Sequence, residues 1–139
     1  MPANAVNPGT MIPTLRYTDA PAAIEWLRVA FGFEPHLVVP GDDGTVVHAQ
    51  LTLGQGMIMV GSARGEDLNR SPTQAGGVTQ SPYIVVEEID AHYARAKAAG
   101  AEMTMEIADQ EHGGRLYSAR DPEGHVWHFG SYDPWATPA

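Results

Sequence analysis

The chain has 139 residues and is 43% hydrophobic, which is the size and composition of one compact domain with its own core. Seventeen acidic against eight basic residues give a net charge of −9, and this balance argues against nucleic acid as a partner, because phosphate-backbone binding needs a basic face. The absence of cysteine excludes disulfides, thiolate metal sites and thiol nucleophiles. No apolar run approaches the roughly 18 residues of a membrane span, and the first residues do not resemble a signal peptide. We therefore expect a soluble, uncleaved, cytoplasmic protein with no membrane partner.

The first half of the chain predicts one strand, one helix and three further strands. Residues 1–10 contain two prolines and a glycine and predict an extended arm. Residues 11–18 alternate as a half-buried strand does, after which Asp19 can cap an amphipathic helix that Gly32 ends. Strands are predicted over residues 33–39 and 45–53, around a turn at 41–44, and over 57–61. Residues 11–62 thus form a predicted βαβββ module.

The second half repeats this order. Residues 63–80 are polar, carry no periodicity and predict a linker. A strand over 82–86, a helix capped by Asp90 and ended by Gly100, and a strand over 101–107 follow, and then a hairpin over 114–132 that turns at Asp121-Pro122-Glu123-Gly124. Residues 81–132 form the second module and 133–139 a C-terminal tail. The sequence predicts an α+β fold built from two βαβββ modules.

Three segments resemble the vicinal oxygen chelate superfamily, and within it the glyoxalase/bleomycin-resistance-like proteins. They are Trp26-Leu27 with Phe31 to Glu34, Val85 to Asp90, and Arg120 to His125. The resemblance covers residues 11–132. It implies a single domain in which curved mixed sheets enclose a pocket, commonly as a homodimer. The fold hosts lyases, epimerases, dioxygenases, thiol transferases and binding proteins without activity, so the chemistry stays open.

Metal-dependent members of that superfamily use a His or Gln on the first strand and a Glu on the last strand of each module. Carried over to this sequence, those positions fall on Ile12, Val60, Ser81 and His128. Only His128 is a good ligand, whereas zinc, iron or manganese needs three or four imidazole or carboxylate donors. We therefore expect no metal and no other cofactor.

Alternation along the strands suggests which side chains face a ligand. His48 and Gln50 share a polar face opposite Ala49 and Leu51, and such a row is either solvated and internally satisfied or ligand-binding. Tyr132 and Trp135, beyond the last strand, could form an aromatic rim or a dimer contact. Three other histidines, His36, His92 and His112, are expected to be exposed, and Asp121 is expected to serve its turn. The candidate ligand contacts are Arg16, His48, Gln50, Ile58, Tyr83, Ser118, His128 and Trp135.

Two functions are compatible with these residues. The first is a metal-independent protein that binds a small molecule, sequestering an aromatic or cationic natural product or antibiotic as bleomycin-resistance proteins do; the acidic charge and the aromatic side chains favour such a guest. The second is a lyase or isomerase in which His128 acts as general base, with or without a divalent metal.

Overall fold

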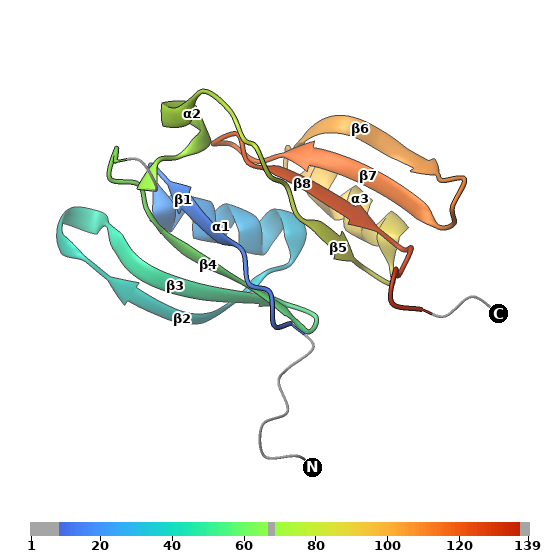
Figure 1. Cartoon of the computed structure of the whole chain (residues 1–139), viewed down its shortest axis with the longest axis horizontal. Helices are drawn as coiled ribbons and strands as arrows, with labels where there is room; N and C mark the ends of the chain where they lie inside the picture. Colours follow the sequence, from blue (N-terminus) through green and yellow to red (C-terminus); the bar gives the residue numbers. More distant parts are fainter. Residues whose placement is uncertain (1–8, 67–68, 137–139) are drawn as a thin grey trace, which may run out of the picture. The chain divides into compact units, whose positions relative to one another are not determined.

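The computed structural model describes residues 9–66 and 69–136. Residues 1–8 of the predicted arm, 67–68 of the predicted linker and 137–139 of the predicted tail lie outside the described residues. The described part forms two four-stranded mixed sheets, each with its own helix (Figure 1). The predicted α+β fold of two βαβββ modules is confirmed.

The first module contains β1 (Thr14–Tyr17), α1 (Ala20–Phe31), β2 (Glu34–Pro40), β3 (Val46–Leu53) and β4 (Gly56–Ser62), with a short 3-10 turn, η1 (Asp42–Gly44), between β2 and β3. Its strands lie in the order β1-β4-β3-β2. β1 and β4 are parallel and the other pairs are antiparallel. β2 is therefore one edge of this sheet.

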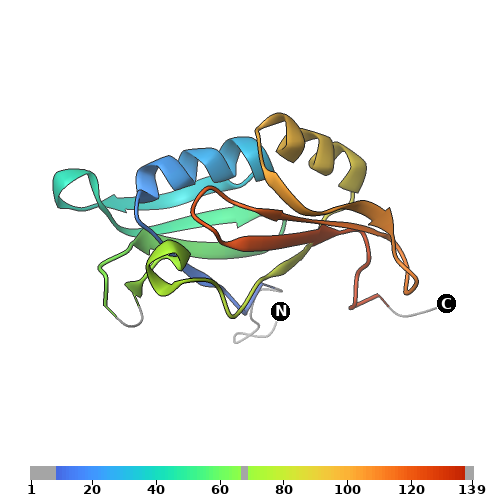
Figure 2. The ribbon, with the colours of Figure 1, turned by 90° about the horizontal axis from the view of Figure 1, so that it is seen from above.

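Helix α1 begins and ends where its flanking residues predict. The Asp19 carboxylate accepts a hydrogen bond from the Ala22 backbone N–H at 3.2 Å, and proline stands in the first turn. Gly32 ends the helix in the left-handed region, with φ of 85°, which a residue with a side chain rarely adopts. α1 covers one face of its sheet (Figure 2). Buried residues of that sheet, on β1, β3 and β4, include Leu15, Tyr17, Ala49, Leu51, Ile58 and Val60.

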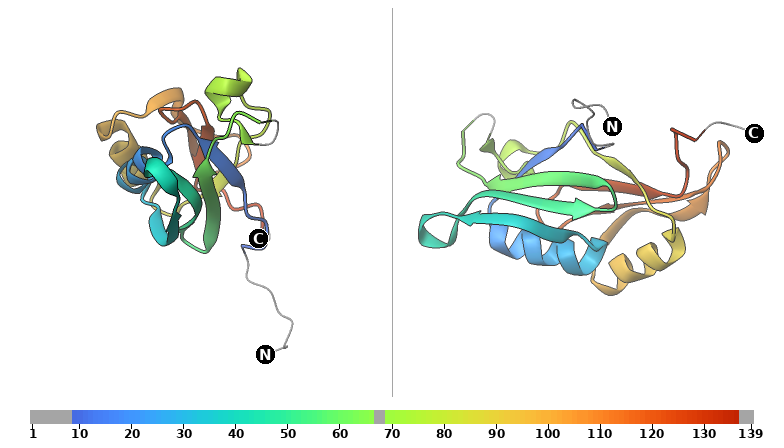
Figure 3. Two further views of the ribbon diagram at one scale, coloured as in Figure 1. Left: turned by 90° about the vertical axis from the view of Figure 1, so that its left-hand side faces the viewer. Right: turned by 90° about the horizontal axis from the view of Figure 1, so that it is seen from below.

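The second module contains β5 (Tyr83–Val85), α3 (Ile89–Ala98), β6 (Glu102–Asp109), β7 (Arg115–Arg120) and β8 (Val126–Gly130). Its strands lie in the order β5-β8-β7-β6, with β5 and β8 parallel. α3 lies on one face of this sheet (Figure 3). The connector before it contains a one-turn helix, α2 (Pro72–Ala75).

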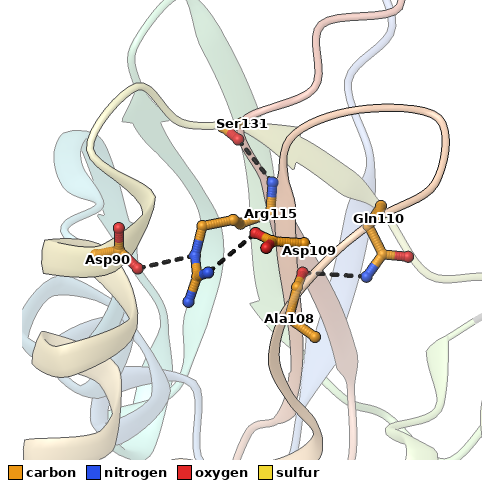
Figure 4. A network of polar contacts seen from close by, with 6 residues as sticks. All are labelled: Asp90, Ala108, Asp109, Gln110, Arg115 and Ser131. Atoms are coloured by element: carbon orange, nitrogen blue, oxygen red, sulfur yellow. Dashed lines mark hydrogen bonds and ion pairs between the residues drawn. The ribbon is translucent and has the colours of Figure 1, made fainter.

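The N-terminal end of α3 differs from the sequence prediction. Glu88 occupies the cap position without a side-chain cap, and Asp90 lies inside the first turn. Asp90 instead accepts a hydrogen bond from Arg115 Nε at 3.1 Å, while the same guanidinium binds Asp109 at 3.0 Å (Figure 4). The Asp90 carboxylate thus pairs with the arginine on β7 and does not cap α3, because a hydrogen bond to a charged guanidinium is stronger than one to a neutral donor.

The modules also repeat in their hydrogen bonds. In the first, Met59 N–H donates to Pro13 O at 2.9 Å, and in the second His128 N–H donates to Pro82 O at 3.0 Å. Likewise the Ser62 hydroxyl accepts from Val46 N–H at 2.8 Å, and the Ser131 hydroxyl accepts from Arg115 N–H at 2.9 Å. These pairs correspond residue for residue, so the second module is a structural copy of the first and Met59 is the counterpart of His128.

The chain divides into two compact units that nearly follow the modules. The last turn of α1, Val29–Phe31, belongs to the second unit, with Pro72 and the residues after it. There the Phe31 ring lies against Trp127 and Phe129, with ring centroids 5.6 and 4.7 Å apart. Within the described residues, no helix is both long and apolar enough to span a bilayer.

His92 is placed differently from the expectation that it is exposed. Its Nε2 lies 2.7 Å from Phe31 O and its Nδ1 lies 2.7 Å from the Tyr117 hydroxyl. The ring also packs against Phe129, with centroids 4.4 Å apart. Aromatic side chains from α1, β7 and β8 therefore enclose this helix residue, and the expected exposure is wrong.

Candidate functional site

Each sheet has one face away from its helix, which we call its open face. On the first sheet a row of side chains crosses all four strands, because paired residues on neighbouring strands point to the same side. The pairs are Leu37 with Gln50, Gln50 with Met59, and Met59 with Thr14. Leu37 keeps 45% of its surface exposed. This row offers apolar surface beside one amide.

His48 and Gln50 contact each other on this open face. Gln50 Nε2 lies 3.0 Å from His48 Nε2. Since an amide nitrogen can only donate, His48 Nε2 accepts, and the proton of the neutral ring is carried by Nδ1. The pair therefore combines a ring N–H donor with an amide oxygen acceptor. The polar row is internally connected, as one of the two sequence interpretations requires, and it still has one hydrogen-bond donor, the ring N–H, and one acceptor, the amide oxygen.

Arg16 belongs to the same sheet, and its side chain lies over Gly61 on the neighbouring strand β4. Its Nη1 donates to Ser62 O at 3.2 Å. A Cβ built on Gly61, the β4 partner of Arg16, would lie 2.9 Å from that nitrogen. The missing side chain at Gly61 thus makes the room in which the guanidinium rests.

The predicted facing of β4 is wrong by one residue. Leu51 pairs with Ile58 and Ala49 pairs with Val60, so Ile58 and Val60 share the helix-covered face, and Ile58 is only 4% exposed. The two-residue turn between Leu53 and Gly56 sets this register. The reason for naming Ile58 as a ligand contact is therefore removed, and the open-face residue of β4 is Met59.

On the second sheet the corresponding row is Tyr83, His128, Ser118 and Met105. Tyr83 pairs with His128, His128 with Ser118, and Ser118 with Met105. The sequence prediction that Tyr83, Ser118 and His128 share a face is confirmed by this register. Ser118 is buried, at 4% exposure, and His128 is half-buried.

His128 lies between two serine hydroxyls. Its Nδ1 is 2.6 Å from Ser118 Oγ and its Nε2 is 2.8 Å from Ser81 Oγ. Ser81, just before β5, was not among the candidate ligand contacts. Serines have no periodic hydrophobic signal, and Ser81 is far from His128 in sequence. Its one sequence signal is that it occupies a metal-ligand position of the family pattern.

The corrected set of superfamily metal positions is Ile12, Met59, Ser81 and His128, since Met59 and not Val60 is the counterpart of His128. One imidazole with a hydroxyl, a thioether and an aliphatic group does not match the donors that hold zinc, iron or manganese. In residues 9–66 and 69–136, no three His, Asp or Glu side chains gather in a group that could hold an ion. The residues present do not fit the superfamily's metal.

Tyr83 belongs to this row, whereas Trp135 lies apart from it. The Tyr83 hydroxyl donates to Tyr132 O at 2.6 Å and passes over Gly130, where a Cβ would come within 2.5 Å of it. Burial and the charge of Asp133 raise the pKa of Tyr83. Trp135 stands on a turn beyond β8 with 92% of its surface exposed, so the structure does not bring it against Tyr83, Ser118 or His128.

Comparisons with known proteins identify a family and relatives of this chain. Residues 10–129 match the family model of the Glyoxalase/Bleomycin resistance protein/Dioxygenase superfamily. The uncharacterized protein Rv0887c of Mycobacterium tuberculosis is 32% identical over 123 residues, which cover 85% of this chain and 71% of that protein.

Two solved structures show the same fold. TioX from Micromonospora sp. ML1 is 39% identical, with a TM-score of 0.71 over 86% of this chain and 95% of TioX. The fosfomycin resistance protein FosX from Listeria monocytogenes, solved with Mn(II), is 18% identical, with a TM-score of 0.66 over 93% of this chain and 94% of FosX. The likeness to FosX concerns the fold alone. The paired βαβββ modules and the family match together show that the chain belongs to the Glyoxalase/Bleomycin resistance protein/Dioxygenase superfamily.

Proposed function

We propose that this protein binds a small organic molecule on the open face of a sheet without a divalent metal, and that it sequesters an aromatic or cationic natural product or antibiotic. The donor set carries this proposal: where the superfamily holds a metal, this chain has Ile12, Met59, Ser81 and His128. Such a set binds a ligand through hydrogen bonds and apolar contact instead of coordination.

The first open face supplies both kinds of contact. Leu37, Val39 and Met59 provide apolar surface, and the His48–Gln50 pair provides one donor and one acceptor. Ligand sites in proteins commonly combine a mainly apolar lining with a few placed polar groups. The net charge of −9 favours a cationic guest over an anionic one.

The proposal predicts thermal stabilisation by a member of the guest class. We expect one or more planar or cationic antibiotics, with bleomycin as the first probe, to raise the melting temperature. A ligand at about a hundred times its Kd stabilises the folded state by about 2.7 kcal/mol. The measurement is a thermal-shift titration followed by calorimetry on each compound that shifts the transition.

The His48→Ala/Gln50→Ala double variant should then lose most of the stabilisation, because both polar contacts on the first open face are removed. His36→Gln is the matched control, since it removes an exposed imidazole on β2 outside the proposed contacts. A panel that leaves the melting temperature unchanged at millimolar concentration would contradict the proposal. So would stabilisation that the double variant retains in full.

A further inference from the structure

The Ser81–His128–Ser118 chain has the arrangement of an activated serine. Three groups are needed for one: a hydroxyl nucleophile, a base within hydrogen-bond reach, and a third group that orients the base. Here the imidazole has a hydroxyl on each ring nitrogen, at 2.8 Å for Ser81 and 2.6 Å for Ser118. All three residues belong to the second module.

The difference in burial between the two serines indicates which one is the nucleophile and which one positions the imidazole. Ser118 is almost fully buried, so its hydroxyl is shielded from solvent, whereas Ser81 is half-buried in the segment just before β5. A neutral imidazole has one N–H and one bare nitrogen. When Nδ1 donates to the buried Ser118, Nε2 is bare and accepts the Ser81 O–H. Ser118 is then the positioning residue, and Ser81 is the hydroxyl on the more accessible side.

We propose that Ser81 is a nucleophile activated by His128, and that the protein accepts an acyl group from an activated carboxylic ester on the Ser81 oxygen. This activity goes beyond the proposed ligand binding and needs no metal. It also differs from general-base lyase chemistry, because a covalent intermediate forms on the protein.

The step balances with the groups named. Ser81 Oγ attacks the acyl carbon and forms a new O–C bond, while its proton moves to His128 Nε2. The tetrahedral adduct then breaks the bond to the leaving alcohol, which takes the proton from His128. In the second half, water adds to the acyl carbon and gives a proton to His128, and Ser81 Oγ leaves and recovers it.

The composition of the chain makes this reaction easy to follow. There is no cysteine, and Lys97 is the only lysine. A hydrogen bond with Tyr93 raises the pKa of Lys97 and keeps its amine protonated. The chain therefore offers no thiol and one lysine amine as competitors for an acyl donor.

The test is acetylation of the intact protein by p-nitrophenyl acetate, followed by mass spectrometry and peptide mapping. We expect one acetyl group on Ser81, none at that position in Ser81→Ala, and acetylation about a hundredfold slower or more in His128→Ala. Ser118→Ala should slow the reaction and change its pH profile, because Nδ1 loses the group that fixes the ring. Ser131→Ala, which removes a hydroxyl that accepts the Arg115 backbone N–H, is the matched control and should react like the wild type.

Acetylation that maps to Lys97 or the chain N-terminus, and that is unchanged in Ser81→Ala, would overturn the proposal. A folded His128→Ala that acetylates Ser81 at the wild-type rate would also overturn it. If His128→Ala does not fold, His128→Gln and the pH dependence of the wild-type rate give the same decision. Because the binding test changes His48 and Gln50 on the first sheet, and the acylation test changes Ser81, His128 and Ser118 on the second, binding and acylation can fail separately.

Discussion

Asp121→Ala is expected to lower the free energy of unfolding by about 2–4 kcal/mol, a large loss for a single substitution. Asp121 is 4% exposed, and both oxygens of its carboxylate accept hydrogen bonds. Its Oδ1 receives the backbone N–H groups of Glu123 and His125 at 3.0 Å, and its Oδ2 receives Trp127 Nε1–H at 3.1 Å. Alanine would leave these donors without this acceptor. Urea unfolding followed by fluorescence measures the effect.

Asp121→Asn separates the loss of charge from the loss of acceptors. Its amide oxygen can still accept the two backbone N–H groups, but its NH2 group would face Trp127 Nε1–H, so we expect an intermediate loss. Asp42→Ala is the matched control, because Asp42 is an exposed turn carboxylate and such surface changes usually cost less than about 0.5 kcal/mol. Equal effects at positions 121 and 42 would contradict the role given to Asp121.

The second large expected effect is a lower free energy of unfolding at acidic pH, caused by protonation of His92. Phe31 O can only accept, so His92 Nε2 carries the proton, and Nδ1 accepts from the Tyr117 hydroxyl. Burial lowers the pKa of His92; the hydrogen bond to Phe31 O opposes this shift in part, and the charge of Arg95 adds to it. Burial also raises the pKa of Tyr117. The folded state therefore holds this ring neutral, with its hydroxyl partner protonated.

The sign of the pH effect follows from this pKa. The unfolded chain takes up a proton on His92 as pH falls through about 6.5, whereas the folded chain does so only at lower pH. The free energy of unfolding should therefore be steady above pH 7 and fall below about 6.5, by at most about 1.4 kcal/mol per pH unit for this group. Urea unfolding at a series of pH values measures it.

The His92→Phe/Tyr117→Phe double variant removes the titrating ring together with its hydroxyl partner, so its free energy of unfolding should no longer fall in this way at acidic pH. His36→Gln should keep the decrease, because it removes only an exposed imidazole on β2. A decrease of the same size in the double variant would show that another group is responsible.

The sequence predicted the bounds of helices and strands well where capping and turn residues mark them. Asp19, Gly32 and Gly100 end or begin helices as expected, and the Asp121 turn set the register of the β7–β8 hairpin. Side-chain facing in the second sheet therefore came out right. These signals act over a few residues, so they can be seen without the rest of the molecule.

The sequence failed where long-range pairing decides. Met57, Ile58, Met59 and Val60 are all apolar, so alternation does not say which of them faces the helix; the pairing of Leu51 with Ile58 does. His92 looked like an exposed helix residue because its partners Phe31 and Tyr117 are distant in the chain. The Ser81–His128–Ser118 chain was hidden for the same reason.

The most direct test is the metal content of untagged protein purified without chelators. We expect zinc, manganese, iron and nickel far below one equivalent per chain, and a melting temperature that EDTA does not change, because His128 has serine hydroxyls on both ring nitrogens. One equivalent of an ion that survives purification, and that His128→Ala releases, would contradict the account.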